Sequence, residues 1–360
     1  MKGNRSASIE AWTSLSSLWA AAKRAARGKR HRASVARVLF ALEPVVLRLR
    51  RSLRDGSWRP GLAHNHVIRD PKTRTITAAP FEDRIVHQAL CAEIGPLLER
   101  HLIARTYACR TGLGTHAALR QARLWARSYP YAVHLDVRKY FPSIDHAIVL
   151  TQIDRALRCP ATLAVCQHIL AAGARLIEPA RFHFPGDDLF TPFCREVGLP
   201  IGHLTSQHFA NRYLSPVDHY ATDRLRIHAY LRYMDDLLLF GRDREQTRDW
   251  AAAIEEACHK QRLRLHPYQV VPTSGGIGFL GFRILPHELR VKRSTVKRAI
   301  VRLQRLAGDA ERDPSLRPRL SASLRATLAH WKHGDTFRLR TKVLRELGFL
   351  AGDFTQDDDD

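Results

Sequence analysis

The stretch Arg232-Tyr233-Met234-Asp235-Asp236-Leu237-Leu238-Leu239-Phe240 places two adjacent carboxylates inside a strongly apolar run. Adjacent side chains on a strand point to opposite faces, so a single strand carrying both Asp residues would bury at least one charge. A buried unpaired carboxylate is very costly. The sequence therefore predicts a tight hairpin in which Tyr233-Met234 end one strand, Asp235-Asp236 form the apex and residues 237–240 return. At such an apex the carboxylates can face a cleft and bind Mg²⁺, which prefers one or two carboxylates plus substrate phosphates.

An isolated Asp-Asp pair is more often a simple turn between two core strands, because Asp is a common turn residue. Here the four residues Tyr233-Met234-Asp235-Asp236 within apolar strands closely resemble a metal-binding box of reverse transcriptases. The resemblance implies that Asp235 and Asp236 are catalytic metal ligands. It also implies that Tyr233 and Met234 contact the template or primer.

The charge of the chain is its most unusual bulk property. Among 360 residues, 58 Lys and Arg stand against 35 Asp and Glu, giving a net charge of +23 and a pI near 10.5. Such an excess predicts a polyanionic partner, most simply nucleic acid held through its phosphates.

No apolar run is long enough to span a bilayer and no secretory signal opens the chain, so we expect a cytoplasmic protein without a membrane partner. The six Cys residues are scattered without C-x-x-C spacing, which predicts neither a zinc site nor a disulfide framework.

The first 54 residues carry thirteen Lys or Arg and only two acidic residues. Apolar residues recur there at helical spacing, so we expect two basic amphipathic helices joined near 28–32.

Beyond these helices, residues 66–68 and 74–76 read as two short strands around a Pro-containing turn. Lys72 and Arg74 would lie at or near the tip, where Arg can clamp phosphate bidentately. Taken alone, the pair is better explained as solvated turn charges.

Several further motifs resemble the fingers of group-II-intron-like reverse transcriptases. Pro-Lys-x-Arg at 71–74 is followed by Asp-Arg-Ile-Val-x-Gln-Ala-Leu at 83–90. The latter lies in a predicted helix that starts at Phe81 and has Glu82 and Asp83 in its first turn. Residues 107–116 match a Tyr-x-x-Arg-x-Gly-x-Gly-x-His element, and its glycines before a helix could hold phosphate or template backbone. The resemblance makes Lys72 and Arg74 contacts to the dNTP and Arg110 a contact to the template.

Residues 131–145 read as an apolar strand that delivers Asp136 at its end, followed by an aromatic pair and a helix start. A lone Asp closing a strand is usually a cap. A two-metal phosphoryl-transfer site, however, needs a third carboxylate, and Asp136 matches the first catalytic Asp of the family. Phe141 matches the aromatic residue that lies beneath the nucleotide sugar and rejects a 2′-hydroxyl. A second carboxylate pair, Asp187-Asp188, lacks apolar strands around it and is predicted to be a surface turn.

Residues 198–211 read as a Gly/Pro turn leading into a helix with Ser and Asn on its surface. Most reverse transcriptases carry Pro-Gln-Gly and then Ser-Pro here, whereas this chain has Ile201-Gly202 and then Ser206-Gln207. This form resembles the enzymes of diversity-generating retroelements, which copy a template RNA with errors at adenines. An apolar Ile201 cannot hydrogen-bond the nucleotide as Gln can, and losing such a contact weakens discrimination by ~1–3 kcal/mol. By the resemblance, dNTP contacts are assigned to Ile201, Gly202 and Gln207, and template or primer contacts to Ser206 and Asn211.

Downstream, 245–258 reads as an amphipathic helix and 263–266 as a strand. Gln269 stands where the family often has a Lys, which leaves no clear general acid for pyrophosphate departure. Residues 277–284 match the strand that grips the primer end, through Phe279, Leu280 and Gly281; the plainer interpretation is a buried strand with glycines at a bulge. From 286 to 348, sixteen Lys or Arg against six Asp or Glu and helical patterns at 294–306 and 320–331 resemble a thumb that holds duplex phosphates.

The predicted fold is α+β, a polymerase right hand with fingers, an antiparallel-sheet palm and a helical thumb. We expect a basic helical N-terminal extension at 1–57, fingers at 58–130 with a return contribution from 146–210, a palm at 131–285, a thumb at 286–350 and an acidic tail at 351–360. The tail is taken as a solvated run outside the fold.

The predicted activity is that of an RNA-directed DNA polymerase using two Mg²⁺ ions, or Mn²⁺ in their place, held by Asp136, Asp235 and Asp236. The expected partners are a structured template RNA, an RNA/DNA hybrid, dNTPs and an accessory basic protein oligomer, in error-prone mutagenic retrohoming. Two alternatives stay open: a reverse transcriptase of an anti-phage defence system or retron, and a non-catalytic RNA-binding protein with a polymerase-like fold.

Overall fold

A computed structural model describes residues 6–68 and 73–348 of the chain. Internal contacts divide the chain into two compact units, each assembled from three separate stretches. The first unit is Met1–Gly112, Leu135–Leu237 and Asp249–Tyr268, and the second is Leu113–His134, Leu238–Arg248 and Gln269–Asp360. These divisions differ from the fingers, palm and thumb boundaries expected above, which remain predictions.

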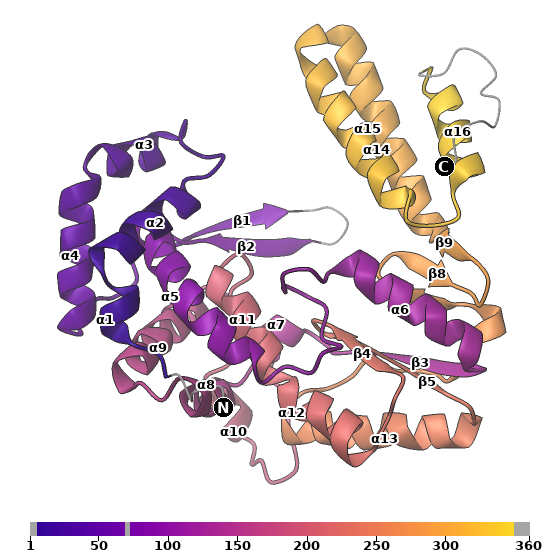
Figure 1. Cartoon of the computed structure of the whole chain (residues 1–360), viewed down its shortest axis with the longest axis horizontal. Helices are drawn as coiled ribbons and strands as arrows, with labels where there is room; N and C mark the ends of the chain where they lie inside the picture. Colours follow the sequence, from indigo (N-terminus) through magenta and orange to yellow (C-terminus); the bar gives the residue numbers. More distant parts are fainter. Residues whose placement is uncertain (1–5, 69–72, 349–360) are drawn as a thin grey trace. The chain divides into compact units, whose positions relative to one another are not determined.

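The basic N-terminal region forms four helices in place of the two expected (Figure 1): α1 (Ile9–Trp12), α2 (Leu15–Ala25), α3 (Ala33–Phe40) and α4 (Leu42–Arg54). The predicted junction near 28–32 separates α2 from α3. The additional break after α1 has a local cause, because the side chain of Ser14 accepts a hydrogen bond from the amide of Ser17 and starts a new helix there. In the first unit α2 also packs against α5.

The rest of the first unit is mostly helical. Its helices are α5 (Phe81–Glu99), α7 (Tyr140–Ser143), α8 (His146–Leu157), α9 (Pro160–Ala174), α10 (Thr191–Cys194), α11 (Leu204–Tyr213) and α12 (Ser215–His219), followed by the π-helical turn η1 (Tyr220–Arg224). The predicted helix start at Phe81, with Glu82 and Asp83 in its first turn, is confirmed. Helix α11 packs against α5 and α8, so the turn that precedes α11 is held by the core of this unit.

The two short strands predicted around 66–68 and 74–76 form an antiparallel hairpin, β1 (His64–Ile68) with β2 (Arg74–Ala78). The register pairs Ile68 with Arg74 and His64 with Ala78. Residues on β1 are exposed throughout, whereas Thr77 on β2 is fully buried. The tip that contains Lys72 lies outside the described residues.

A four-stranded sheet has the order β4-β5-β3-β6, from β3 (Tyr131–Asp136), β4 (Tyr230–Tyr233), β5 (Asp236–Gly241) and β6 (Val271–Pro272). The predicted strand ending at Asp136 is confirmed. The boundary between the units passes through β3 and β5, so the ends that carry Asp136 and Asp236 both belong to the first unit. Residues 263–266, predicted as a strand, make only an isolated bridge between Leu265 and Val137. Helix α13 (Arg244–Lys260) extends the predicted helix by one residue at its start and two at its end.

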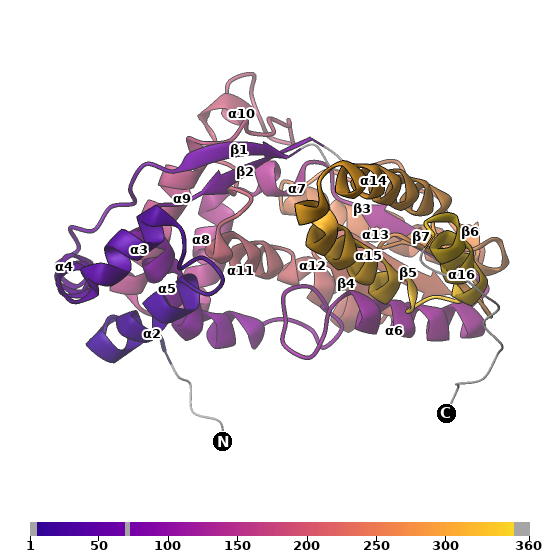
Figure 2. The same cartoon turned by 90° about the horizontal axis from the view of Figure 1, so that it is seen from above.

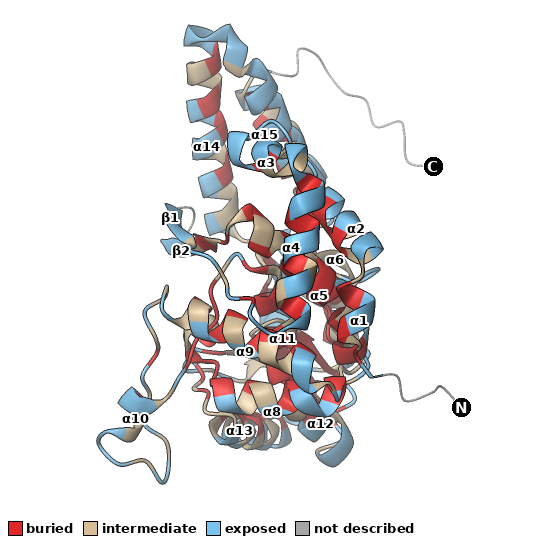
Figure 3. Cartoon of the chain, turned by 90° about the vertical axis from the view of Figure 1, so that its left-hand side faces the viewer, coloured by how far each residue is buried: buried red, intermediate tan, exposed pale blue. Residues whose placement is uncertain are grey.

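The second unit contains α6 (Thr115–Ser128) and a three-stranded antiparallel sheet of β7 (Ile277–Phe279), β8 (Phe282–Ile284) and β9 (Leu289–Val291). Its C-terminal part is helical: α14 (Arg293–Arg312), α15 (Arg317–Trp331) and α16 (Phe337–Glu346), with the 3₁₀ turns η2 (Thr273–Gly275) and η3 (Pro314–Leu316). Helices α14 and α15 lie side by side (Figures 1 and 2), packed through a cluster of Leu and Ala side chains. Figure 3 shows the buried stripe of α14 between exposed faces.

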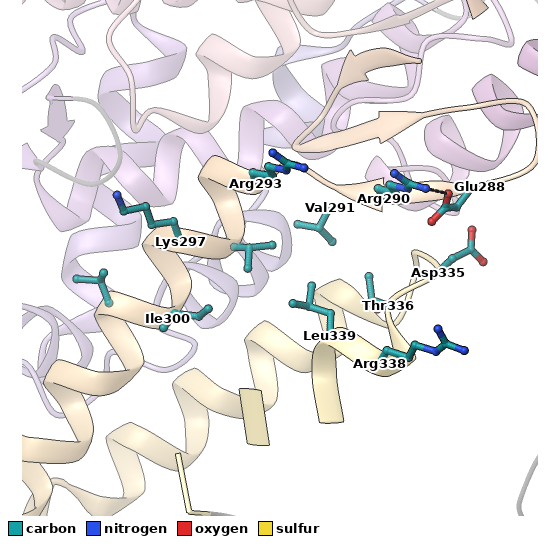
Figure 4. Close-up of a pocket in the computed structure, with 12 residues that line it drawn as sticks. Glu288, Arg290, Val291, Arg293, Lys297, Ile300, Asp335, Thr336, Arg338 and Leu339 are labelled. Carbon is teal, nitrogen blue, oxygen red and sulfur yellow. Dashed lines mark ion pairs between the residues drawn. The ribbon is translucent and has the colours of Figure 1, made fainter. Parts of the chain in front are cut away.

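A pocket of about 610 Å³ lies in the second unit between β9, α14 and the start of α16 (Figure 4). Apolar side chains including Val291, Ile300 and Leu339 line it. It is also lined by four cationic side chains: Arg290, Arg293, Lys297 and Arg338. Arg290 is paired with Glu288 at 2.5 Å, whereas the other three make no ion pair with any described residue. Two acidic side chains, Glu288 and Asp335, also line the pocket, so its positive charge is only partly balanced.

The structure combines helices with β-strands, and every strand pair whose register is described is antiparallel. These features confirm the predicted α+β class. Among the described helices, none combines the length and the hydropathy that a bilayer span requires.

Candidate active site

The hairpin predicted from the opening stretch is present, but its apex is one residue earlier than expected. Strand β4 ends at Tyr233, Met234 and Asp235 form the turn, and Asp236 already begins β5. Met234 has a φ of +58°, an uncommon left-handed conformation for a residue other than glycine. Because Asp235 and Asp236 are successive residues at a turn rather than both on a strand, each stays partly exposed.

The third predicted carboxylate lies beside this turn. The amide of Val137, which follows Asp136, donates a hydrogen bond to the carbonyl oxygen of Asp235 at 3.3 Å. On its other side, the carbonyl oxygen of Asp136 accepts a hydrogen bond from the amide of His266 at 2.8 Å. Two residues separated by almost a hundred positions in the chain are thus neighbours within one unit.

Electrostatics agrees with this proximity. Burial raises the pKa of Asp235 to about 6, the carboxylates of Asp236 and Asp136 add to the rise, and the guanidinium of Arg74 opposes it. Like charges held this close favour a bound cation. Over 6–68 and 73–348, no three His, Cys, Asp or Glu side chains are placed to hold a metal ion by themselves. Mg²⁺ is commonly bound by only one or two carboxylates, and substrate phosphates complete its coordination. The neighbouring carboxylates of this turn are therefore compatible with Mg²⁺ once a substrate is bound.

Arg74 occupies the first position of β2 and acts electrostatically on Asp235, so its positive charge is near the carboxylates. Its side chain is exposed, which leaves it accessible to a ligand. Its predicted companion, Lys72, belongs to the stretch that the structure does not describe.

Phe141 lies on α7, shortly after the strand that ends at Asp136, and is half-buried. Its ring meets the ring of Tyr140 edge-on, with centroids 5.8 Å apart. The Tyr140 hydroxyl donates to the carbonyl oxygen of Ala210 at 2.5 Å, and the amide of Leu199 donates to the carbonyl oxygen of Phe141 at 2.8 Å. The backbone of Phe141 is thus attached to the segment that precedes α11, and its ring lies against that of Tyr140.

The turn with Ile201 and Gly202 is attached to β2. The amide of Thr77 donates to the carbonyl oxygen of Ile201 at 2.7 Å. Gly202 has a φ of +114°, and a Cβ at this position would lie 2.5 Å from the carbonyl oxygen of Thr77. The space beside this glycine is filled by β2, and the dNTP contact assigned to Gly202 stays a prediction. Gln207 is exposed on α11 and Ile201 is half-exposed.

Three residues expected on an accessible template surface are otherwise engaged. Ser206 is 2% and Asn211 is 4% exposed, so their predicted position on the helix surface is wrong. The amide nitrogen of Asn211 donates to the carbonyl oxygen of Ala108 at 2.8 Å. Arg110 donates through Nη1 to the carbonyl oxygens of Ile103 and Thr106 at 2.9 and 3.0 Å. The side chains of Asn211 and Arg110 support the local backbone, Ser206 is buried, and a direct template contact of these three residues remains a prediction.

The predicted primer-grip strand at 277–284 is instead a hairpin of the second unit. Phe279 pairs with Phe282, and Leu280 and Gly281 form a two-residue turn with φ of +45° and +85°. Two positive φ values suit a hairpin turn, because they match the twist of the flanking strands. Both Phe rings are buried. The glycine thus serves a tight turn rather than the bulge that we considered.

The carboxylates of Asp187 and Asp188 are used by their own loop. Asp187 is paired with Arg195, and Asp188 accepts hydrogen bonds from the amides of Phe190 and Thr191 at the start of α10. This agrees with the surface turn that we predicted.

Sequence reasoning did not assign a role to Arg232 or Asp218. Their side chains form an ion pair with no exposed surface. An Arg inside an apolar strand was the available signal, because a fully buried charge requires a partner.

A family model described as reverse transcriptase (RNA-dependent DNA polymerase) matches residues 68–284, more than half of the chain. The chain belongs to the reverse transcriptase family. Every carboxylate of the candidate site falls inside the matched range of this reverse transcriptase domain. The match and the mixed helix and antiparallel-sheet content confirm the predicted polymerase right-hand fold class. Family members are RNA-directed DNA polymerases, which are nucleotidyltransferases.

Solved structures similar to this reverse transcriptase include three yeast telomerases. Telomerase from Candida albicans in complex with a fragment of telomeric RNA is 11% identical, with a TM-score of 0.45 over 81% of this chain and 55% of that chain. A truncated apo telomerase from Candida tropicalis is 12% identical, with a TM-score of 0.43 over 64% and 55%. Apo telomerase from the same species is 10% identical, with a TM-score of 0.48 over 80% and 62%. The chain thus spans 55–62% of the length of these structures. No curated protein matches it in sequence.

Proposed function

We propose that this chain is an active reverse transcriptase that extends a primer with dNTPs along an RNA template. The observation that carries the proposal is the hydrogen bond from the amide of Val137 to the carbonyl oxygen of Asp235, since it brings Asp136 beside the Asp235-Asp236 turn. Two-metal nucleotidyl transfer uses acidic side chains from neighbouring segments, and the adjacent backbones of Asp136 and Asp235 support this assignment.

Asp136 and Asp235 would hold the two divalent ions, and Asp236 would support the ion on the primer side. When bound, such ions supply activation of the primer 3′-hydroxyl and neutralisation of the leaving pyrophosphate. The positive charge of Arg74 near Asp235 suits the triphosphate of the incoming nucleotide, because guanidinium groups bind phosphate bidentately. Lys72 would add a second cation from the same hairpin.

The ring of Phe141 would exclude ribonucleotides. Its half-buried position on α7, shortly after the strand of Asp136, supports this role. A 2′-hydroxyl pressed against it would be desolvated without a hydrogen-bond partner. Phe141 would thus select dNTPs.

Primer and template contacts are proposed for Tyr233 and Met234 at the turn, and for Phe279, Leu280 and Gly281 in the second unit. The net charge of +23 supports binding of an RNA/DNA hybrid mainly through phosphates. Burial of Ser206 and Asn211 favours an indirect contribution, through the placement of α11 and its exposed Gln207.

We further propose that the template is a dedicated structured RNA and that copying is error-prone, as in diversity-generating retroelements. The support is Ile201, an aliphatic side chain where a hydrogen-bonding Gln is usual, together with Ser206-Gln207. An accessory basic protein oligomer belongs to the same proposal. A retron or anti-phage role would use the same site with a different RNA, and sequencing the co-purified RNA and its extension products distinguishes these roles.

The deciding experiment is dNTP incorporation on a primed RNA template by wild type and by the Asp235→Asn, Asp236→Asn double variant. We expect incorporation to be lost and thermal unfolding to remain cooperative. The control is Asp187→Asn with Asp188→Asn, an Asp-Asp pair used by its own loop, which should retain incorporation. Incorporation that survives in the first variant would refute the site, and a wild type without incorporation would favour the non-catalytic RNA-binding alternative.

A further inference from the structure

Arg232 and Asp218 form the most completely buried ion pair of the described chain. Their side chains have no exposed surface, and Nη2 of Arg232 lies 2.7 Å from Oδ2 of Asp218. The carboxylate also accepts hydrogen bonds from Tyr230 Oη at 2.8 Å and Thr106 Oγ1 at 3.3 Å. Burying such a pair commonly costs more in desolvation than the attraction returns. A pair placed two residues before the catalytic turn therefore calls for an explanation other than stability.

The guanidinium group of Arg232 uses all of its donors, and only some of them go to Asp218. Nε and Nη2 bind Asp218 at 2.7–2.9 Å, and Nη2 also donates to the carbonyl oxygen of Asn211 at 2.9 Å. Nη1 donates to Oδ1 of Asn211 at 3.3 Å and to the carbonyl oxygen of Met234 at 2.9 Å. Five N–H groups in a rigid fork thus reach acceptors on three separate segments.

The contact to Met234 is the informative one. Met234 has a φ of +58°, a conformation that costs free energy for a residue with a side chain and persists only where surrounding contacts enforce it. The hydrogen bond from Arg232 fixes the carbonyl group of this residue, and the next residue is Asp235. The direction in which Asp235 leaves the turn is therefore set from inside the core.

The same guanidinium connects the turn to α11. Asn211 accepts from Arg232 through both its side-chain and its main-chain oxygen, and its amide nitrogen donates to the carbonyl oxygen of Ala108. Helix α11 carries the exposed Gln207 proposed to contact the nucleotide. A single side chain thus links the carboxylate turn with the helix on which a nucleotide contact lies.

We infer that Arg232, held by Asp218, is a positioning residue that keeps the Met234-Asp235 turn in its left-handed conformation and in register with α11. This inference rests on the proposed function for its catalytic consequence. It assigns Arg232 no contact with substrate. Lys at this position would keep the charge but lacks the planar fork, so it could pair with Asp218 without also holding Met234 and Asn211.

The test compares Arg232→Lys with Arg262→Lys. Arg262 pairs with Asp145, whose carboxylate is likewise buried, at 2.5 Å, and it does not contact the turn. Amide hydrogen exchange of the peptide spanning 230–240 is measured without metal or nucleic acid, alongside primer extension. In Arg232→Lys we expect exchange at the turn to rise about tenfold or more and kcat to fall about 10- to 100-fold, as the loss of hydrogen bonds from a charged donor predicts. The KM for dNTP should change little, and Arg262→Lys should leave the exchange at the turn unchanged.

If Arg232→Lys does not fold, Tyr230→Phe removes one hydrogen bond from Asp218 and should raise exchange at the turn in the same direction. A folded Arg232→Lys whose turn exchanges as slowly as wild type would overturn the inference, as would equal acceleration in Arg262→Lys. A wild type without incorporation would instead refute the proposed function, and the exchange measurement would still decide whether Arg232 positions the turn.

Discussion

Gly202 lies so close to Thr77 that a Cβ at position 202 would come within 2.5 Å of the Thr77 carbonyl oxygen. The hydrogen bond from the amide of Thr77 to the carbonyl oxygen of Ile201 holds the two backbones together. The strand that carries Arg74 is therefore attached directly to the turn before α11.

This contact predicts that Gly202→Ala lowers the free energy of unfolding by more than the backbone strain of an alanine at positive φ. Gly114→Ala is the matched control, because Gly114 has a φ of +119° and no atom near its missing Cβ. We expect Gly114→Ala to lower the free energy of unfolding by about 1–2 kcal/mol through backbone strain. Gly202→Ala should lose roughly 1–3 kcal/mol more, the usual cost of overpacking. Chemical denaturation measures both, and equal losses would contradict the close contact.

Phe141→Ala should admit ribonucleotides. Removing the ring leaves room for a 2′-hydroxyl, and we expect the preference for dNTP over rNTP to fall by about 10- to 200-fold, the range set by differences in pocket size. Primer extension with each nucleotide measures the ratio of kcat/KM values. Phe193→Ala, at an aromatic residue that is 61% exposed on α10, is the control. An unchanged ratio in Phe141→Ala would argue against the role of Phe141 in sugar selection.

Arg74→Ala should weaken dNTP binding more than it slows turnover. Its guanidinium acts on Asp235 and is accessible from solvent, so its loss removes one charge from the nucleotide side of the site. We expect the KM for dNTP to rise about tenfold, in line with a charge-assisted hydrogen bond of about 1.5 kcal/mol. Arg37→Ala, at an exposed position on α3, serves as the reference. A KM equal to that of the reference would remove Arg74 from the nucleotide site.

Stability should depend on pH through Asp83. Burial raises the pKa of its carboxyl to about 6, although the amide of Gly61 opposes this and Glu82 adds to it. Because the folded pKa exceeds the unfolded value of about 3.9, the folded state binds the extra proton between these values. The resulting stability is complete below about pH 4 and is lost as the pH rises to about 6.

Asp83→Asn should therefore flatten this dependence between pH 4 and 7 and raise the free energy of unfolding near pH 7 by about 2 kcal/mol. Its side-chain oxygen can still accept from Gly61. Asp154→Asn, an exposed change on α8, should leave the profile unaltered. A profile of Asp83→Asn that is parallel to wild type would show that this carboxyl does not titrate as described.

Divalent metal should stabilise the folded chain through the carboxylate turn. A ligand that binds only the folded state adds about 2.7 kcal/mol when its concentration is a hundred times its Kd. We expect the Tm of wild type to rise with added MgCl₂, and the rise to vanish in Asp235→Asn with Asp236→Asn. Equal shifts in both proteins would place the stabilising ion elsewhere.

The parts predicted well from sequence were those with a strong local signal. The strand ending at Asp136, the helix starting at Phe81 and the hairpin around Asp235 each combine an apolar period with a turn or cap. The position of the apex was missed by one residue. Met234 has a positive φ, and its carbonyl oxygen accepts a hydrogen bond from Arg232, whose guanidinium is held by Asp218 and Asn211.

Errors came where burial depends on partners distant in the chain. Ser206 and Asn211 have polar side chains typical of a helix surface, yet α11 packs against α5 and α8 and its polar groups are satisfied inside. Likewise, 277–284 alternates like one strand. The turn at Leu280 and Gly281 is set by pairing of Phe279 with Phe282, which a periodic pattern does not specify.

The assembly of the second unit from three stretches has a consequence for synthesis. The buried side of α6, with Ala118, Leu119 and Ala122, packs against β8, which is translated more than 150 residues later. At about 5–20 residues per second, that apolar face waits roughly 10–30 s on the ribosome for its covering strand. Transiently exposed apolar surface of this kind favours chaperone binding and aggregation, so we expect slower expression at low temperature with added chaperone to raise the yield of soluble protein.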